Sequence, residues 1–230
     1  MAAVIDRFAM TSSAAHRIIA IDGPAASGKS SVARELAHRL DFIYVNSGAM
    51  YRAITWLVLE RGIAADDSSA IEKLVETASI ACDLQEGESR ILIERTDPAR
   101  FLRQDRVNRN VSLVSSVPRV REILVAHLRK YGAEHDVVME GRDIGSVVFP
   151  DTTFKFYIDA SPNVRLRRRV AQGHRDEIAA RDWVDSSRKA SPLIIAEDAN
   201  VIDTSNVTID AVVDEIITLL KMKGLEIRSD

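Results

Sequence analysis

The chain has 230 residues, of which 46% are apolar, so it can bury the core of one domain with insertions. Its 31 lysines and arginines are balanced by 34 aspartates and glutamates, giving a formal charge of −3. This balance argues against nucleic acid as a partner, and no apolar run approaches the ~20 residues that a membrane span requires.

Residues 1–16 lack the basic and apolar regions of a secretory signal. We expect them to form a flexible leader, and Met10 is an alternative start. Cys82 is the only cysteine, which excludes an internal disulfide and favours a reducing, cytoplasmic setting. The five histidines show no metal-ligand spacing, so no zinc site is expected.

From residue 17 onward, short β-branched runs alternate with segments of helical period. Strands are predicted at 17–22 and 42–45, and helices at 31–40 and 49–61, with Gly62 as a helix-ending glycine. Strands separated by helices indicate an α/β fold with a doubly wound parallel sheet.

Residues 66–103 interrupt this alternation. Ser69 and Glu72 have the spacing of a capping box for a helix through about residue 78. Two strand-like runs, "SIACDL" and "RILIE", follow on either side of a turn-rich stretch. The pattern predicts a small β-containing insertion.

Helices are then predicted at 103–115 and 118–132, with Pro118 at a first helical position. The α/β alternation resumes in the rest of the chain. The predicted strands are 137–140, 154–159 and 199–204, and the predicted helices follow Ser161 and cover 209–223.

The stretch "GPAASGKS" fits the phosphate-binding pattern G-x-x-x-x-G-K-[ST] between a predicted strand and a predicted helix. Inward backbone N–H groups and the positive helix end would cradle the phosphates of ATP. Lys29 supplies a point charge and Ser30 a ligand for Mg²⁺. The predicted ATP-binding residues of this loop are Gly23, Pro24, Ala25, Ala26, Ser27, Gly28, Lys29, Ser30 and Ser31.

Arginines accompany this loop in several separate segments, including "GRD" at 141–143 and "RLRRR" at 165–169. Arginine engages phosphate oxygens with a forked, permanently charged group. Phosphoryl transfer needs such groups on both the donor and the acceptor phosphate. No N-K-x-D motif of a GTPase is present. The sequence therefore favours a nucleoside monophosphate kinase.

Six segments make this reading more specific: "IDGPAASGKS", "NSGAMYR", "PRVRE", "MEGRDIGSVVFPD", "IDASPNVRLRRR" and "RDWVDSSRKASPL". Together they resemble the bacterial cytidylate kinases over nearly the whole chain from Arg17. The resemblance implies transfer of the γ-phosphoryl group of ATP to CMP or dCMP with Mg²⁺, in pyrimidine nucleotide metabolism. It also implies a monomer.

The resemblance implies one domain over 17–230 behind the leader. Its core would comprise 17–65, 104–164 and 182–230, with a monophosphate-binding insertion at about 66–103 and a short lid at about 165–181. In the lid, Arg168 and Arg169 would lie beside the ATP phosphates. The segment joining "RLRRR" to "ARD" is shorter than in familiar members, so we expect more futile ATP hydrolysis.

The family motifs also imply residue roles on the acceptor side. Ser47, Ser112, Arg121 and Asp143 would face the base. Arg52, Arg142 and Arg188 would hold the acceptor phosphate, and Arg181 and Asp185 would reach the sugar hydroxyls. The implied catalytic set is Lys29, Arg142, Arg181 and Arg188. Taken alone, Ser47 also fits an N-cap, and Arg142–Asp143 also fits a structural ion pair.

The chain departs from the family at Asn46, where an aspartate is usual, and at Glu140, where aspartate is frequent. Asn46 would keep a hydrogen bond and lose a charge near the metal. Asp22 and Glu140, at predicted strand ends, are then the acids expected to contact waters around Mg²⁺.

Two alternatives remain open at this point. One is a kinase for another small acceptor, such as shikimate or a different nucleotide. The other is a regulatory module that binds NTP without catalysis. An assay of ADP release with and without CMP would separate both from a cytidylate kinase.

Overall fold

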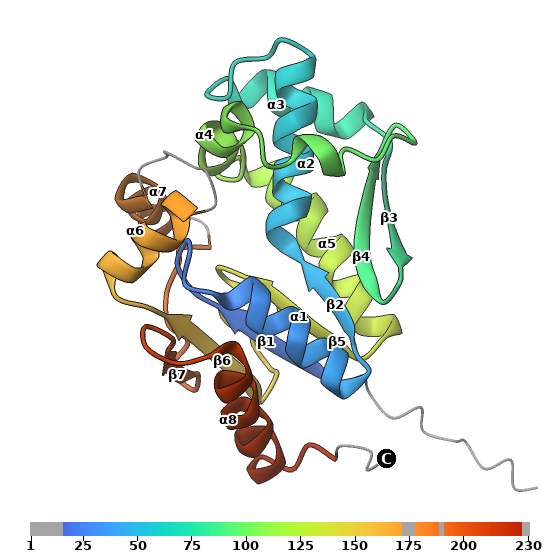
Figure 1. Ribbon diagram of the computed structural model, residues 1–230. Coiled ribbons are helices and arrows are strands. Elements are labelled where there is room, and N and C mark those ends of the chain that lie inside the picture. Colours follow the sequence, from blue (N-terminus) through green and yellow to red (C-terminus); the bar gives the residue numbers. More distant parts are fainter. Residues whose placement is uncertain (1–15, 172–177, 189–190, 227–230) are drawn as a thin grey trace, which may run out of the picture.

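The computed structural model describes residues 16–171, 178–188 and 191–226. In this part, seven strands form one sheet in the order β3-β4-β2-β5-β1-β6-β7 (Figure 1). Among the strands of the described residues, β3 and β4 form the one antiparallel pair, and the other pairs are parallel. The predicted α/β fold is thus confirmed. The strands are β1 (Ile18–Asp22), β2 (Ile43–Asn46), β3 (Ile80–Gln85), β4 (Glu88–Ile93), β5 (Val137–Gly141), β6 (Phe154–Asp159) and β7 (Asn200–Asp203).

Helices connect and cover these strands. None of those in the described part is long and apolar enough to span a membrane. The helices are α1 (Lys29–Leu40), α2 (Ser47–Glu60), α3 (Ser68–Thr77), α4 (Asp105–Val114), α5 (Pro118–Glu134), α6 (Pro162–Ala171), α7 (Ile178–Ser187) and α8 (Ile209–Met222), with a 3-10 turn η1 (Ala99–Phe101) and a π-helix η2 (Ile144–Val148).

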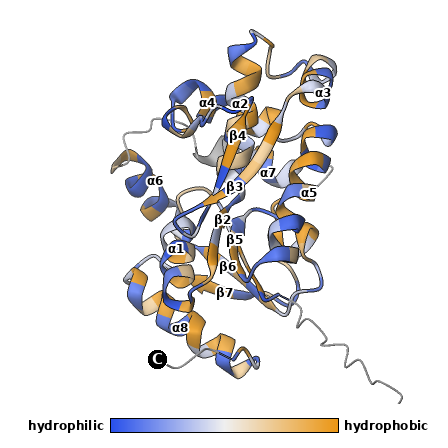
Figure 2. Ribbon diagram, turned by 90° about the vertical axis from the view of Figure 1, so that its right-hand side faces the viewer, coloured by the Kyte–Doolittle hydropathy of each residue, from blue (hydrophilic) through white to orange (hydrophobic). Residues whose placement is uncertain are grey.

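The sheet separates two apolar clusters because successive strand residues point to opposite faces. Tyr44 and Val138 belong to the cluster with α1 and α8, whereas their neighbours Val45 and Met139 belong to the cluster with α2, α3 and α5. Figure 2 shows the apolar strands between helices that carry both polar and apolar residues. Burial on both faces explains why the central strands are almost uniformly apolar.

Segment 66–103 contains α3, the β3–β4 hairpin and η1. The two predicted strands are confirmed, and they extend the central sheet, because Glu88 of β4 pairs with Tyr44 of β2. The predicted capping box is wrong. The cap of α3 is Asp67, whose side chain accepts a hydrogen bond from Ala70 N at 3.0 Å. A carboxylate one residue before the helix already satisfies that amide.

Helix α5 begins at Pro118 as predicted, but it runs past Gly132 to Glu134. Gly132 lies inside the helix. A Cβ there would sit 2.6 Å from Phe149 Cζ, so the packing of Phe149 against the helix accounts for a glycine at this position. Gly62 has φ 68° after α2, as expected for a helix-ending glycine.

Polar residues lie at the carboxyl ends of the parallel strands. In the sheet register, Glu140 is beside Ile21 of β1 on one side and Asn46 of β2 on the other. Asp22 is beside Gly141. Ligands of open α/β sheets bind outside this edge, which directs attention to the loops that follow β1, β2 and β5.

Candidate active site

The loop between β1 and α1 has the backbone of a phosphate cradle. Gly23 has φ 153°, and a Cβ there would lie 2.1 Å from the carbonyl oxygen of Ile158, so a larger residue would displace the chain. Ala26 and Gly28 also have positive φ values, 60° and 94°. The predicted strand–loop–helix context of this motif is confirmed.

Lys29 and Ser30 begin α1, whose first turn has no acidic residue to weaken its positive end. The Lys29 ammonium group is buried and donates to Pro24 O at 3.0 Å. Ser30 Oγ donates to Glu140 Oε2 at 2.8 Å. A cationic side chain and a hydroxyl group therefore stand at the mouth of the loop.

Helix α6 and the end of β7 hold the loop from outside. Arg168 donates to Ser27 O at 3.1 Å and to Thr204 O at 2.7 Å. Thr204 Oγ1 donates to the same Ser27 carbonyl at 2.7 Å. These contacts tie the Ser27 carbonyl to α6 and to the end of β7.

The loop is also held at Ala25, two residues before Ser27. Arg165 donates to Ala25 O at 3.2 Å and forms an ion pair with Asp182, whose other carboxylate oxygen accepts from Ala25 N at 3.1 Å. Arg169, also predicted to lie near ATP, is buried and lines the cavity described next.

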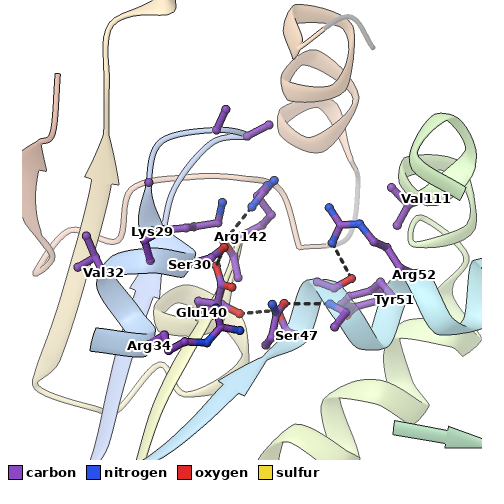
Figure 3. A pocket seen from close by; sticks show the side chains of 18 of the residues that line it. Lys29, Ser30, Val32, Arg34, Ser47, Tyr51, Arg52, Val111, Glu140 and Arg142 are labelled. Atoms are coloured by element: carbon purple, nitrogen blue, oxygen red, sulfur yellow. Dashed lines mark hydrogen bonds between the residues drawn. The ribbon is translucent and has the colours of Figure 1, made fainter. Parts of the chain in front are cut away.

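One cavity of about 890 Å³ runs from the phosphate loop to the arginines of the predicted acceptor side. Figure 3 shows Lys29 and Ser30 on one side of it and Arg52, from α2, on the other. The cavity thus brings residues that the sequence assigned to ATP close to residues that it assigned to CMP, although Gly23, Pro24 and Ser27 of the first group do not line it. Those on the acceptor side are Ser47, Arg52, Ser112, Arg121, Arg142, Asp143, Asp185 and Arg188.

Asp185 of α7 is the centre of the arginine cluster. Its buried carboxylate accepts from Arg142 Nε at 3.0 Å, from Ser112 Oγ at 3.1 Å and from Arg188. Arg188 also donates to Ser115 Oγ at 2.9 Å. Burial lowers the pKa of Arg188, and the Asp185 charge opposes that shift. The predicted residue Arg181 lies in α7, but its side chain is outside the described part.

Arg121 and Asp143 form a buried ion pair at the inner end of the cavity. Arg121 also donates to Ser115 O at 3.3 Å, and its guanidinium carbon lies 5.2 Å from the centre of the Tyr51 ring. On the other wall, Arg52 donates to Gly48 O at 2.9 Å. A Cβ at Gly48 would lie 2.9 Å from that guanidinium.

Asp22 and Glu140 occupy different surroundings. Both oxygens of Asp22 accept from backbone N–H groups, of Ile144 and Gly145, at 2.8 Å. Burial raises the pKa of Asp22 to about 7 despite these two bonds. Glu140 instead meets hydroxyl groups, those of Ser30 and Tyr44.

The structure corrects the local reading of Asn46 and Ser47. Asn46 is the N-cap of α2, since its side chain accepts from Ala49 N at 2.9 Å, so an N-cap at Ser47 is wrong. Ser47 Oγ donates to Glu140 O at 2.7 Å. Asn46 and aspartate are similarly good caps, which is a reason for Asn46 that does not involve metal.

Sequence reasoning missed Tyr44, Ser115, Asp182 and Thr204, which bond the predicted residues. Asp182 lies within the quoted motif "RDWVDSSRKASPL", in the middle of α7, which was a usable signal, whereas Thr204 follows β7 outside the quoted motifs. Tyr44 reads as a core strand residue, and nothing in its spacing marks it.

A family model described as cytidylate kinase matches residues 19–222. The chain belongs to the cytidylate kinase family. It is 42% identical to the cytidylate kinase of Caldanaerobacter subterraneus subsp. tengcongensis over 88% of this chain and 94% of that one. It is also 42% identical to the cytidylate kinase of Desulforamulus reducens, over 88% of this chain and 96% of that one. It is 40% identical to a cytidylate kinase of Clostridium botulinum, over 88% of this chain and 97% of that one.

Membership of the cytidylate kinase family makes the chain a phosphotransferase with cytidylate kinase activity and ATP as the phosphate donor. Both alternatives raised by the sequence, another acceptor kinase and a non-catalytic module, are thereby overturned. The continuous cavity between the phosphate loop and the arginine cluster agrees with transfer of a phosphoryl group between two bound nucleotides.

Proposed function

We propose that this member of the cytidylate kinase family transfers the γ-phosphoryl group of ATP directly to the phosphate of CMP or dCMP, with the residue roles given below. The carrying observation is the single cavity that joins the phosphate loop to three arginines. The acceptor phosphate is already anionic, so an in-line attack needs no general base. The protein contributes position and positive charge.

On the donor side, backbone N–H groups of the loop between β1 and α1 and the Lys29 ammonium group hold the ATP phosphates. Arg168 and Arg169 of α6 line the same cavity. The bonds of Arg168 to the loop carbonyl support a positioning role, because they hold the cradle in shape before ATP arrives.

On the acceptor side, Arg52, Arg142 and Arg188 grip the CMP phosphate, and Asp185 holds two of these arginines in place. An ordered cluster places its charge where negative charge develops and avoids reorganisation during the reaction. Lys29, Arg142 and Arg188 face the transferring group. Arg181 remains a sequence-based assignment to the sugar and to the catalytic set.

The buried pair of Asp143 and Arg121 suits cytosine. A carboxylate accepts from the exocyclic N4 amino group, and a guanidinium donates to N3 and O2. Uracil places an oxygen where Asp143 needs a donor and an N–H where Arg121 needs an acceptor. Each unpaired buried group costs about 1–3 kcal/mol. Ser47 and Ser112 complete the wall around the base.

Ser30 and Glu140 fit Mg²⁺, because a hydroxyl oxygen and a carboxylate oxygen 2.8 Å apart are the hard donors that this ion prefers. No cluster of three or more acidic, cysteine or histidine side chains in the described ranges could hold a metal by itself. ATP phosphates would therefore supply further ligands. Bound there, Mg²⁺ would neutralise phosphate charge. Asp22 has both oxygens on backbone N–H groups, so we assign the closer metal contact to Glu140.

We further propose that segment 66–103 acts as the monophosphate-binding region, since Glu88, Ser89, Leu102 and Arg103 line the cavity. A monomer in the cytoplasm is the remaining expectation, and gel filtration with light scattering measures the first part of it.

A coupled assay of ADP release tests the proposal. Turnover should require an acceptor, with kcat/KM for CMP and dCMP at least tenfold above that for UMP. Comparable values for UMP and CMP would contradict the roles of Asp143 and Arg121. Shikimate serves as an acceptor that should give no signal above the background without acceptor.

A further inference from the structure

Glu140 is held from two sides by hydroxyl groups. Ser30 Oγ of α1 donates to Oε2 at 2.8 Å, and the Tyr44 hydroxyl of β2 donates to Oε1 at 2.6 Å. Tyr44 and Glu140 are both buried. Figure 3 shows Glu140 directly below Ser30 in the cavity wall. The orientation of the Glu140 carboxylate toward Ser30 therefore depends on Tyr44 of β2, a strand to which we assign no phosphate-binding residue.

Asn46 determines how the Tyr44 hydroxyl is used. Its Oδ1 accepts from Ala49 N at 2.9 Å as the cap of α2, and its Nδ2 donates to the Tyr44 hydroxyl at 3.1 Å. A phenol has one proton to donate. Because Asn46 presents a donor to the tyrosine oxygen, that proton is directed to Glu140.

Arg34 packs over the same tyrosine. Its guanidinium carbon lies 4.7 Å from the centre of the Tyr44 ring, and Nε donates to Glu88 Oε1 at 2.6 Å. The ring is thus fixed by a stacked cation while its hydroxyl is fixed by hydrogen bonds.

We propose that Tyr44 and Asn46 are positioning residues for the magnesium site, which aim Glu140 at Ser30. This inference rests on the proposed role of Ser30 and Glu140 at the metal. In this arrangement, the Asn46 amide N–H group leaves the Tyr44 hydroxyl with Glu140 as its acceptor. An aspartate in its place would still cap α2, but its second oxygen would compete with Glu140 for the tyrosine proton.

The test is calorimetric titration of the full chain with ATP, once with Mg²⁺ and once with EDTA. Tyr44→Phe should reduce the Mg²⁺-dependent gain in ATP affinity by roughly tenfold, a usual effect of losing a group that orients a metal ligand. Affinity in EDTA should stay at the wild-type value. Tyr131→Phe is the matched control, since that buried hydroxyl donates to Asp83 O outside the cavity.

Asn46→Asp provides a second, independent variant. Alone it should lower the Mg²⁺-dependent gain to a similar extent, and added to Tyr44→Phe it should change the gain by less than about twofold, because coupled residues are not additive. A Tyr44→Phe variant with the wild-type gain overturns the inference, as does an Asn46→Asp variant that binds Mg²⁺·ATP more tightly. A wild-type protein without any Mg²⁺-dependent gain overturns the proposed metal site as well.

Discussion

Arg121 and Asp143 face each other with 6% and 4% of their side chains exposed, which makes them a nearly water-free ion pair in the wall of the cavity. The two residues come from α5 and from the loop after β5. The pair that we propose to read the base is therefore also a contact between two distant parts of the chain. Stability and base recognition should respond together when it is broken.

Arg121→Met tests this directly. It leaves the Asp143 carboxylate buried without its partner, which costs about 3–5 kcal/mol in comparable cases. We expect a lower free energy of unfolding in urea and a loss of kcat/KM for CMP.

The double variant Arg121→Met/Asp143→Leu separates the two effects. Replacing a buried pair by apolar groups is often neutral for stability, so unfolding should return toward wild type while CMP turnover stays lost. Recovery of CMP turnover in the double variant would show that the pair does not read the base.

The strand, loop and helix around the motif "GPAASGKS" could be predicted because the motif is contiguous, and the structure has them as β1, the loop after it and α1. The residues that we propose for the acceptor come from five separate segments, and those with described side chains line one cavity. Their partners were less accessible. Nothing in the pattern indicated that Asp185 would hold both Arg142 and Arg188, since that contact depends on how α7 packs against the loop after β5.

Errors occurred where two neighbouring residues compete for one local role. Asn46 and Ser47 are both good caps, as are Asp67 and Ser69, and the choice is decided by where each helix starts. The hairpin at 80–93 was predicted as two strands, but its pairing with β2 through Glu88 is a long-range contact that periodicity does not encode.

Thr204→Val tests the clamp on the phosphate loop. The variant keeps the shape of the side chain and removes the hydroxyl that donates to Ser27 O and accepts from Arg168. Losing such a bond costs about 1 kcal/mol, so KM for ATP should rise about fivefold with KM for CMP unchanged. Thr55→Val is the control, because that buried hydroxyl bonds Tyr51 O within α2. Equal KM changes for the two nucleotides would contradict a role confined to the loop.

The raised pKa of the buried Asp22 carboxyl group predicts that the free energy of unfolding depends on pH. Desolvation raises its pKa from 3.8 to about 7, more than the Gly145 and Ile144 amides lower it. The folded protein then binds a proton that the unfolded chain has released, so this contribution is complete below pH 3.8 and is lost as pH rises to about 7. The slope is at most about 1.4 kcal/mol per pH unit.

The measurement compares urea unfolding of wild type and Asp22→Asn across that range. Asparagine does not titrate, so the stability of wild type relative to the variant should fall as the pH increases. Profiles that run parallel between pH 3.8 and 7 would show that Asp22 keeps an ordinary pKa in the folded protein.

The short connection after α6 gives the last prediction. The segment between Ala171 and Ile178 lies outside the described residues, so its length is taken from the sequence. Ser30 and Ser31, at the start of α1, are exposed. A lid excludes water from the transferring phosphoryl group. With little chain to cover ATP, water should reach it, and we expect phosphate release from ATP in the absence of CMP that exceeds the rate for a longer-lid relative. Cytidine, which offers the base without a phosphate, is the control: it should leave this hydrolysis measurable, whereas CMP should replace it by transfer. An ATPase rate indistinguishable from buffer would mean that the short segment still excludes water.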